Sequence, residues 1–129
     1  MAPVSSHLLH GQAAEALAAR HLATQGLQPV ARNFRCRFGE LDLVMLQGGV
    51  LVVVEVRSRR RTAVATPAAT VGWRKQRRLV GATRYFLLRH RQYADWPVRF
   101  DVVEVIGELA APTLRWNRAA FTLDDMAAR

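Results

Sequence analysis

Two apolar runs separated by a pair of glycines dominate the hydrophobic pattern of the chain. The runs extend over residues 39–46 and 50–57, and both are rich in Leu and Val. Short apolar runs that flank turn residues are typical of paired β-strands. Gly48 and Gly49 suit the positive φ angles of a type I′ turn. The pattern therefore predicts an antiparallel hairpin.

Acidic residues interrupt both predicted strands. Asp42 and Glu55 each stand between two aliphatic residues, although acidic residues are uncommon in strands. If the two glycines form the whole loop, Asp42 lies directly opposite Glu55. The same register places Glu40 opposite Arg57, on the same face of the hairpin. Opposite Cβ atoms are about 5 Å apart, so the two carboxylates repel unless a proton or a divalent cation lies between them.

Two alternatives to this acidic pair follow from the pattern. A three-residue loop would shift the register by one residue and separate the carboxylates, unless a bulge restored it. An ordinary hairpin with one solvent-facing side would also carry scattered charges on that side.

Helical and strand patterns precede the hairpin. Apolar residues at helical spacing predict a helix from about Leu8 to Gln25, and Gly26 is a stop signal. Alternating apolar and polar residues predict a strand from Leu27 to Arg37. Pro29 indicates an edge strand or the start of a strand.

The second half of the chain alternates helix and strand patterns. Thr66-Pro67 is typical of a helix N-cap followed by proline, and predicts a helix that runs to about His90. Residues 98–106 predict a strand, and a further short strand is predicted around residues 114–116. Helix, three strands, helix and one or two strands make an α/β or α+β layer arrangement.

Lys75 is the only lysine of the chain, and it lies on the apolar side of the predicted second helix. It is four residues from both Val71 and Leu79. Its side chain either reaches to the helix edge or places its ammonium group over the acidic side of the hairpin.

The chain is strongly basic, which narrows the choice of partner. It holds 19 Lys+Arg against 10 Asp+Glu, a formal charge of +9, and nearly all of the positive charge is arginine. Arginine suits bidentate phosphate recognition, so nucleic acid is the first partner to consider. Residues 57–61 hold four arginines directly after the acidic hairpin, although a solvated loop explains such a run equally well. A GC-rich genome also produces an arginine-rich chain.

Length and composition limit the number of domains, the disulfides and the cellular setting that we expect. The chain suits one domain, residues 1–129, with segments 1–7 and 122–129 expected to be flexible tails. A single cysteine, Cys36, excludes an intrachain disulfide and fits a cytoplasmic setting. The sequence shows no signal-peptide or membrane-spanning pattern, so we expect no membrane partner.

Several motifs, read in order, resemble the YraN-like family of uncharacterised bacterial proteins. The match covers about residues 11–121, and its most specific block extends from Asn33 to Arg59. Other matching motifs are Gly11-x-x-x-Glu15, Lys75 and Arg99-Phe100-Asp101-Val102-Val103. This family is assigned a restriction-endonuclease-like fold and grouped with the PD-(D/E)XK nucleases. The resemblance implies a mixed central sheet of four to five strands flanked by helices, in the order αβββαβ(β).

The resemblance also implies roles for individual acidic residues. Asp42 and Glu55 would bind Mg²⁺ or Mn²⁺. Glu15 matches an extra acidic ligand of resolvase-like members, and Glu40 would be an outer-shell or second-metal carboxylate.

The motif lysine is replaced in this chain. Arg57 stands at its position, and arginine cannot act as a base at neutral pH. Lys75 is the only candidate for a lysine that has moved to the following helix. Either Lys75 substitutes for it, or the metal alone activates water, or catalysis has been lost.

Two main functions follow. The first is a metal-dependent nuclease, structure-directed and resolvase-like, with Asp42, Glu55, Arg57 and Lys75 as catalytic residues. The second is a catalytically inactive nucleic-acid-binding protein that retains the fold, and a scaffold for an acidic protein is a third. DNA is favoured over RNA, and a homodimer is compatible with the sequence. The expected nucleic-acid contacts are Arg35, Arg37, Arg59, Arg60, Arg61, Arg74 and Arg78.

Overall fold

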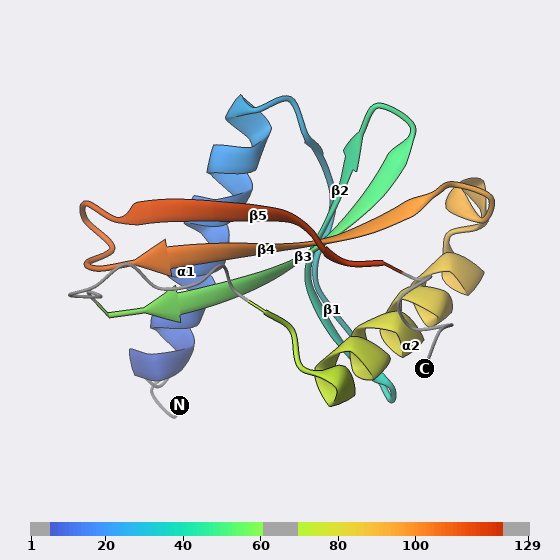
Figure 1. Ribbon diagram of the computed structural model, residues 1–129, viewed down its shortest axis with the longest axis horizontal. Coiled ribbons are helices and arrows are strands. Elements are labelled where there is room, and N and C mark those ends of the chain that lie inside the picture. Colours follow the sequence, from blue (N-terminus) through green and yellow to red (C-terminus); the bar gives the residue numbers. More distant parts are fainter. Residues whose placement is uncertain (1–5, 61–69, 123–129) are drawn as a thin grey trace, which may run out of the picture.

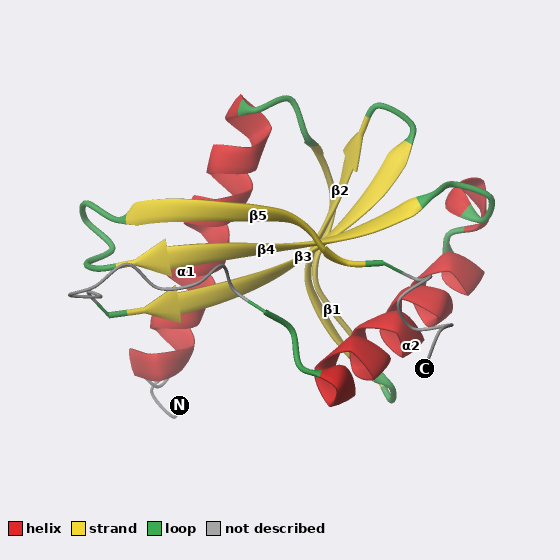
Figure 2. Cartoon of the chain, in the orientation of Figure 1, coloured by secondary structure: helices red, strands yellow, loops and turns green. Residues whose placement is uncertain are grey.

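Five strands form one sheet with a long helix on each face, as Figures 1 and 2 show. The computed structural model describes residues 6–60 and 70–122. The elements are α1 (Ser6–Thr24), β1 (Gln28–Cys36), β2 (Gly39–Gln47), β3 (Val50–Arg59), α2 (Trp73–Arg89), the 3₁₀ helix η1 (Arg91–Tyr93), β4 (Val98–Ile106) and β5 (Thr113–Phe121). This mixed α+β arrangement confirms the predicted order of elements, and the last strand is longer than expected.

The strand order in the sheet is the order in the chain. Neighbouring strands are antiparallel, except that β3 and β4 are parallel and are joined by the connection that contains α2. β1 and β5 are the edge strands. Pro29 therefore lies in an edge strand, as predicted, and the β1–β2 register shifts between Pro29 and Ala31. Proline has no backbone N–H to donate, so it is tolerated in an edge strand, which has a neighbouring strand on one side only.

The β2–β3 hairpin has the predicted register. Gln47 pairs with Val50 and Leu43 pairs with Val54, so the two glycines form the whole loop. Only Gly48 of the two has a positive φ, +54°, so the turn differs from the expected type I′.

The paired part of this hairpin ends at Leu43 and Val54. Before Leu43, β2 pairs with β1, and after Val54, β3 pairs with β4. Figure 1 shows the start of β2 turning with β1 toward α2, while the end of β3 runs with β4 to the opposite side. We term this opening, between Asp42 on β2 and Glu55 on β3, the fork. It places the two acidic residues at the point where the sheet divides.

Apolar side chains cover both faces of the hairpin, so the interpretation of a surface hairpin with one solvent-facing side is wrong. On one face α2 packs on the sheet, and the buried residues there include Leu41, Val44, Leu51, Val53, Leu79, Phe86 and Phe100. On the other face α1 supplies small side chains that allow close packing, and the buried residues include Ala14, Ala18, Leu22, Leu43, Met45, Val52 and Val54. Burial on both faces explains why the two runs are nearly continuous in Leu and Val.

The predicted start of the second helix is wrong. Residues 70–72 are not helical, and α2 begins at Trp73 after an extended Gly72 with φ −62° and ψ 153°. Val71 is buried, and its carbonyl accepts a hydrogen bond of 2.7 Å from Gln76 Nε2. Branched Thr70 and Val71 followed by glycine favour this extended entry over a helix. The Thr66-Pro67 cap itself lies outside the described residues.

A buried carboxylate holds the last strand. Asp101 is 2% exposed and accepts hydrogen bonds from Trp116 Nε1 and from the Ala119 backbone N–H, each at 2.9 Å. Arg99 Nε lies 2.9 Å from the same carboxylate. These contacts stabilise the irregular stretch of β5 where Phe100 pairs with Phe121 but Val102 pairs with Asn117.

The expected tails fall mostly outside the described part of the chain, although Ser6 and His7 belong to α1. Among the described residues, no helix combines the length and the apolar character that crossing a bilayer requires.

Candidate functional site

Asp42 and Glu55 meet in the fork. Asp42 Oδ2 accepts a hydrogen bond of 2.8 Å from the Val56 backbone N–H, so this side chain replaces the missing rung of the β2–β3 ladder. The Glu55 carboxyl group lies close enough to raise the pKa of Asp42. Glu55 is only 9% exposed, at the end of a run of buried valines. The pair that the hairpin register predicted is therefore assembled, through side chains at an open part of the ladder.

The carboxyl group of Asp42 holds its proton unusually strongly. Burial is the largest of the causes that raise its pKa from 3.8 to about 7, and the nearby charge of Glu55 acts in the same direction. The Val56 N–H and the Lys75 ammonium group oppose this shift. A shared proton or a cation relieves the repulsion of two such close carboxylates.

Lys75 lies at the fork, as one of its two interpretations predicted. It belongs to the first turn of α2, and its Nζ atom is 3.4 Å from Glu55 Oε2. Its side chain is 46% exposed, so the ammonium group bridges the buried carboxylate and solvent. Glu55 Oε2 is itself buried and accepts no hydrogen bond within the described residues. The site thus contains a carboxylate oxygen with unused acceptor capacity.

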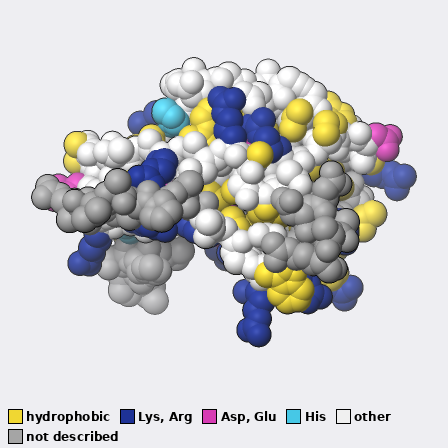
Figure 3. Space-filling model, in the orientation of Figure 1, with side chains coloured by type: hydrophobic (Ala, Val, Ile, Leu, Met, Phe, Trp, Pro, Cys, Tyr) yellow, Lys and Arg dark blue, Asp and Glu magenta, His cyan; other side chains and the backbone are white. Residues whose placement is uncertain are grey.

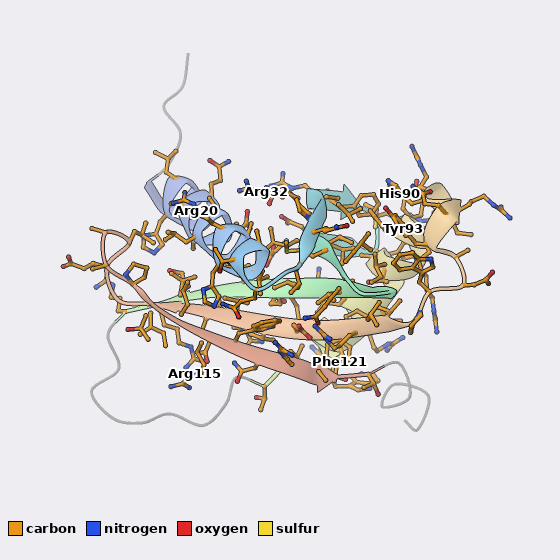
Figure 4. The ribbon with its side chains drawn as sticks, turned by 90° about the horizontal axis from the view of Figure 1, so that it is seen from above. Arg20, Arg32, His90, Tyr93, Arg115 and Phe121 are labelled. Carbon is orange, nitrogen blue, oxygen red and sulfur yellow. The ribbon has the colours of Figure 1, made fainter. Side chains whose placement is uncertain are left out.

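Glu15 approaches the same place from α1. Burial raises its pKa, as does the neighbouring Asp42, while a hydrogen bond with Asn33 and the charge of Arg32 lower it. Figure 4 shows Arg32 on the α1 side of the sheet. Glu15 Oε1 is buried without a hydrogen-bond partner among the described residues.

Asn33 lies at the fork, although no role was predicted for it from the sequence. It lies in β1 with φ +53°, directly beside Asp42 in the β1–β2 register. Asparagine tolerates the left-handed region better than most residues. An asparagine inside an otherwise alternating strand was the signal that could have identified it.

Glu40 and Arg57 do not meet each other. Glu40 Oε1 is 3.5 Å from Arg35 Nε on β1, where the two residues are register partners. Arg57 lies beyond the fork, in register with Glu104 of β4. The expected Glu40–Arg57 pair therefore does not form, because the ladder that would align them has already opened.

The donor set at the fork suits a hard divalent cation, although fewer groups converge there than the resemblance implied. Within residues 6–60 and 70–122, no three His, Cys, Asp or Glu side chains surround a common point that one ion could occupy. Asp42 and Glu55 are the adjacent pair, and Glu15 and Glu40 flank them. Mg²⁺ commonly takes one or two carboxylates plus water and phosphate oxygens, so two ligands fit that chemistry.

The predicted nucleic-acid contacts divide into paired and exposed arginines. Arg59 Nε is 2.9 Å from the fully buried Glu104, and Arg115 Nη1 is 3.5 Å from the same carboxylate. Figure 4 shows Arg115 on β5, at the end of the strand away from Phe121. Glu104 lies between two valines, so the signal that singled out Glu55 would also have found it.

The remaining predicted arginines lie nearer solvent. Arg37 stacks on Phe38 with 4.8 Å to the ring centre. Arg35, Arg60, Arg74 and Arg78 are exposed, and Arg61 lies outside the described residues. On the face drawn in Figure 3, Lys and Arg side chains clearly outnumber Asp and Glu, and some gather over the start of α2. The basic surface therefore extends around the helix that carries Lys75.

Similarity to known proteins extends over most of the chain. The sequence model of "Uncharacterised protein family UPF0102" matches residues 14–105. A UPF0102 protein of Stutzerimonas stutzeri is 49% identical over 111 residues, which cover 86% of this chain and 92% of that protein. Another from Xanthomonas campestris is 51% identical over 115 residues, covering 89% and 93%. One from Saccharophagus degradans is 43% identical over 122 residues, covering 95% and 100%.

Proposed function

Because the chain belongs to the uncharacterised protein family UPF0102, whose name states no activity, we propose a function from the site itself: metal-dependent hydrolysis of phosphodiester bonds in nucleic acid. Family membership confirms the predicted YraN-like relationship. The restriction-endonuclease-like core and the PD-(D/E)XK grouping are parts of this proposal. A five-stranded mixed sheet with a helix on each face is compatible with them.

The observation that carries the proposal is the pair Asp42–Glu55 with Lys75 beside it. Two carboxyl groups lie close together here, with one ammonium group beside them, and one of the two has a pKa of about 7. Strongly perturbed acids that cluster with a charge partner are typical of functional sites. The basic surface around α2 supplies the charge complementarity that a polyanion requires.

Asp42 and Glu55 would hold Mg²⁺ or Mn²⁺, which lowers the pKa of a bound water and offsets charge on the phosphate. The proton that Asp42 holds would have to leave for both carboxylates to act as ligands. Lys75 Nζ, 3.4 Å from Glu55, orients that carboxylate and neutralises charge near the phosphate. Arg57 follows Glu55 on the same face of β3 and would donate hydrogen bonds to a phosphate oxygen.

The deciding experiment is calorimetric titration of Mn²⁺ or Mg²⁺ into the wild type and into Asp42→Asn and Glu55→Gln. We expect uptake by the wild type and its loss in both variants. Asp95→Asn is the matched control, since Asp95 is an exposed aspartate in the loop before β4, and it should bind like the wild type. If the wild type takes up no ion, the titration is repeated with an uncleavable DNA bound. Absence of uptake there as well would contradict the nuclease proposal.

A nuclease screen follows from metal uptake. Branched, single-stranded and duplex DNA, each beside the matching RNA, are incubated with the metal-loaded protein and separated on denaturing gels. Asp42→Asn should lose cleavage while still folding. Equal cleavage by wild type and Asp42→Asn would exclude these carboxylates as the catalytic ligands.

Binding without catalysis is the second candidate, and Arg57 at the position of the motif lysine favours it. On this alternative the arginine surface binds nucleic acid, and the acidic pair has only a structural role. It predicts affinity that is insensitive to Mg²⁺ and to Asp42→Asn, with no cleavage of any substrate.

A further inference from the structure

A hollow lies between α2 and the turn that joins β1 to β2, next to the fork. Its volume is about 300 Å³, and its lining residues are Arg35, Cys36, Gly39, Glu40, Lys75, Arg78 and Leu79. We term it the α2 hollow. It is several times larger than the roughly 30 Å³ that one water molecule occupies in the liquid, so a phosphate group has room there.

The charge of the α2 hollow favours an anion. Three of its lining side chains are cations and one, Glu40, is an anion. Glu40 is 3.5 Å from Arg35, and Lys75 is shared with Glu55 at 3.4 Å. Arg78 forms no ion pair within the described residues, because none of the ion pairs there includes it. A net positive hollow with an unpaired guanidinium group suits a phosphate.

Close backbone packing fixes the walls of the α2 hollow. A Cβ atom on Gly39 would meet the Arg78 carbonyl oxygen at 3.2 Å, and one on Gly81 would meet Phe38 Cβ at 3.2 Å. The strand turn and the helix therefore approach each other more closely than most side chains permit. This contact brings Arg35 of β1 and Arg78 of α2 to one hollow.

Lys75 connects the α2 hollow to the fork, because it lines the first and contacts Glu55 in the second. We infer that the α2 hollow binds a phosphodiester group of the same nucleic-acid strand, next along the chain from the phosphate held at Asp42 and Glu55. The inference rests on the proposed function, which places the neighbouring phosphate at Asp42 and Glu55. It assigns Arg35 and Arg78 to positioning the strand, and Lys75 to both phosphates.

Cys36 provides the test, because it lines the α2 hollow and is the only cysteine of the chain. The protein is treated with a thiol-alkylating reagent in EDTA, with and without a single-stranded oligonucleotide, and modification is followed by intact mass. At an oligonucleotide concentration ten times the Kd, alkylation should slow about tenfold if only the free protein reacts. Fluorescence anisotropy of a labelled oligonucleotide measures the Kd in parallel, and inorganic phosphate is tested as a second protecting probe.

Control variants test whether the protection of Cys36 arises in the α2 hollow. A Cys36→Ser, Leu88→Cys protein moves the thiol to an exposed position late in α2, and its alkylation should not slow. Arg35→Gln with Arg78→Gln should abolish the protection of Cys36, whereas Arg84→Gln, which removes one positive charge at an exposed α2 position outside the hollow, should preserve it. Comparing rates with and without ligand in each variant cancels any change in intrinsic thiol reactivity.

Separate outcomes identify separate failures. Binding by anisotropy with no protection of Cys36, or equal protection of the Leu88→Cys thiol, would overturn the hollow and leave nucleic-acid binding intact. Protection that survives loss of both arginines would also overturn it. Protection of Cys36 in a wild-type protein that takes up no metal, even with uncleavable DNA bound, would support the hollow and contradict the metal site. No binding and no protection by either probe would contradict both the α2 hollow and the proposed action on nucleic acid.

Discussion

Asp42 has two simultaneous tasks, and only one of them is visible in the sequence. The hairpin register predicts its meeting with Glu55, because a two-residue glycine loop fixes which residues face each other. The hydrogen bond from the Val56 N–H depends on the opening of the ladder, which no local pattern predicts. The burial of Asp42 at the fork raises its pKa, and this shift can be measured.

The raised pKa of Asp42 predicts a pH-dependent stability in EDTA. The unfolded chain loses this proton near the ordinary value of 3.8, and the folded protein keeps it up to about pH 7. The native state therefore binds more protons between these values, and the contribution of this group to stability falls as pH rises through that window. Asp42→Asn, which cannot ionise, should gain in Tm relative to wild type as pH rises from 4 to 7.

Thermal unfolding from pH 4.5 to 8 checks this prediction, with Asp95→Asn as the exposed control. The control should track the wild type at every pH. A Tm difference between Asp42→Asn and wild type that stays constant across the series would contradict the assigned pKa.

Replacing Asp101 should lower the free energy of unfolding by a large amount. Asp101→Ala would leave Arg99 without its ion partner and the Trp116 and Ala119 N–H donors without their acceptor. Removing one partner of a buried pair costs about 3–5 kcal/mol. Urea unfolding should show that loss, against a change within about 0.5 kcal/mol for the exposed Asp95→Ala. An equally small loss for Asp101→Ala would show that the network contributes little.

At the scale of elements, the sequence predicted types well and boundaries less well. β4 has the predicted bounds, because apolar residues lie on both of its faces and both faces are buried. The threonine and proline before α2 predict a helix start that is too early, since α2 begins at Trp73. Val71 is buried in the core, and the local hydrogen bond from Gln76 to its carbonyl accompanies the extended entry to α2.

The contact between α2 and the β1–β2 turn predicts a strict requirement for glycine at position 39. Gly39 has φ +154°, and an added Cβ would meet the Arg78 carbonyl oxygen at 3.2 Å. Gly39→Ala should cost roughly 1–3 kcal/mol in unfolding free energy, because neither backbone segment can move independently. Gly49→Ala is the control, since nothing lies within 4 Å of its Cβ and its φ is not positive. Equal stability of both variants in urea would refute the close packing.

At the scale of the whole molecule, the sequence predicted the order of elements and the net charge, but not how the sheet divides. Strand order and the parallel β3–β4 pair arise from long-range contacts. The approach of Glu15 to Asp42 likewise depends on how α1 lies across the sheet. Local periodicity carries no information about such distances, so Glu15 entered the site only through the family resemblance.

The formal charge of +9 predicts strongly salt-dependent binding to nucleic acid. On duplex DNA each neutralised phosphate contributes about −0.9 to the slope of log K against log salt concentration. Loss of Arg35 and Arg78 together should make the slope less steep by about two such contributions, and Arg84→Gln should alter it less. Anisotropy titrations between 50 and 300 mM salt measure the slope. A slope near zero would exclude an electrostatic interface.

The hydrogen bond between Asp42 and Val56 has a consequence for how this protein can evolve. A lineage that no longer needed chemistry at the fork would still need an acceptor for the Val56 N–H, since the neighbouring strand offers none there. Purifying selection on folding alone would then retain an aspartate or asparagine at position 42. Lys75 is half exposed in the first turn of α2 and satisfies no backbone group among the described residues, so we expect position 75 to be substituted first. Loss of Lys75 among descendants, rather than loss of Asp42, would therefore record the end of catalysis.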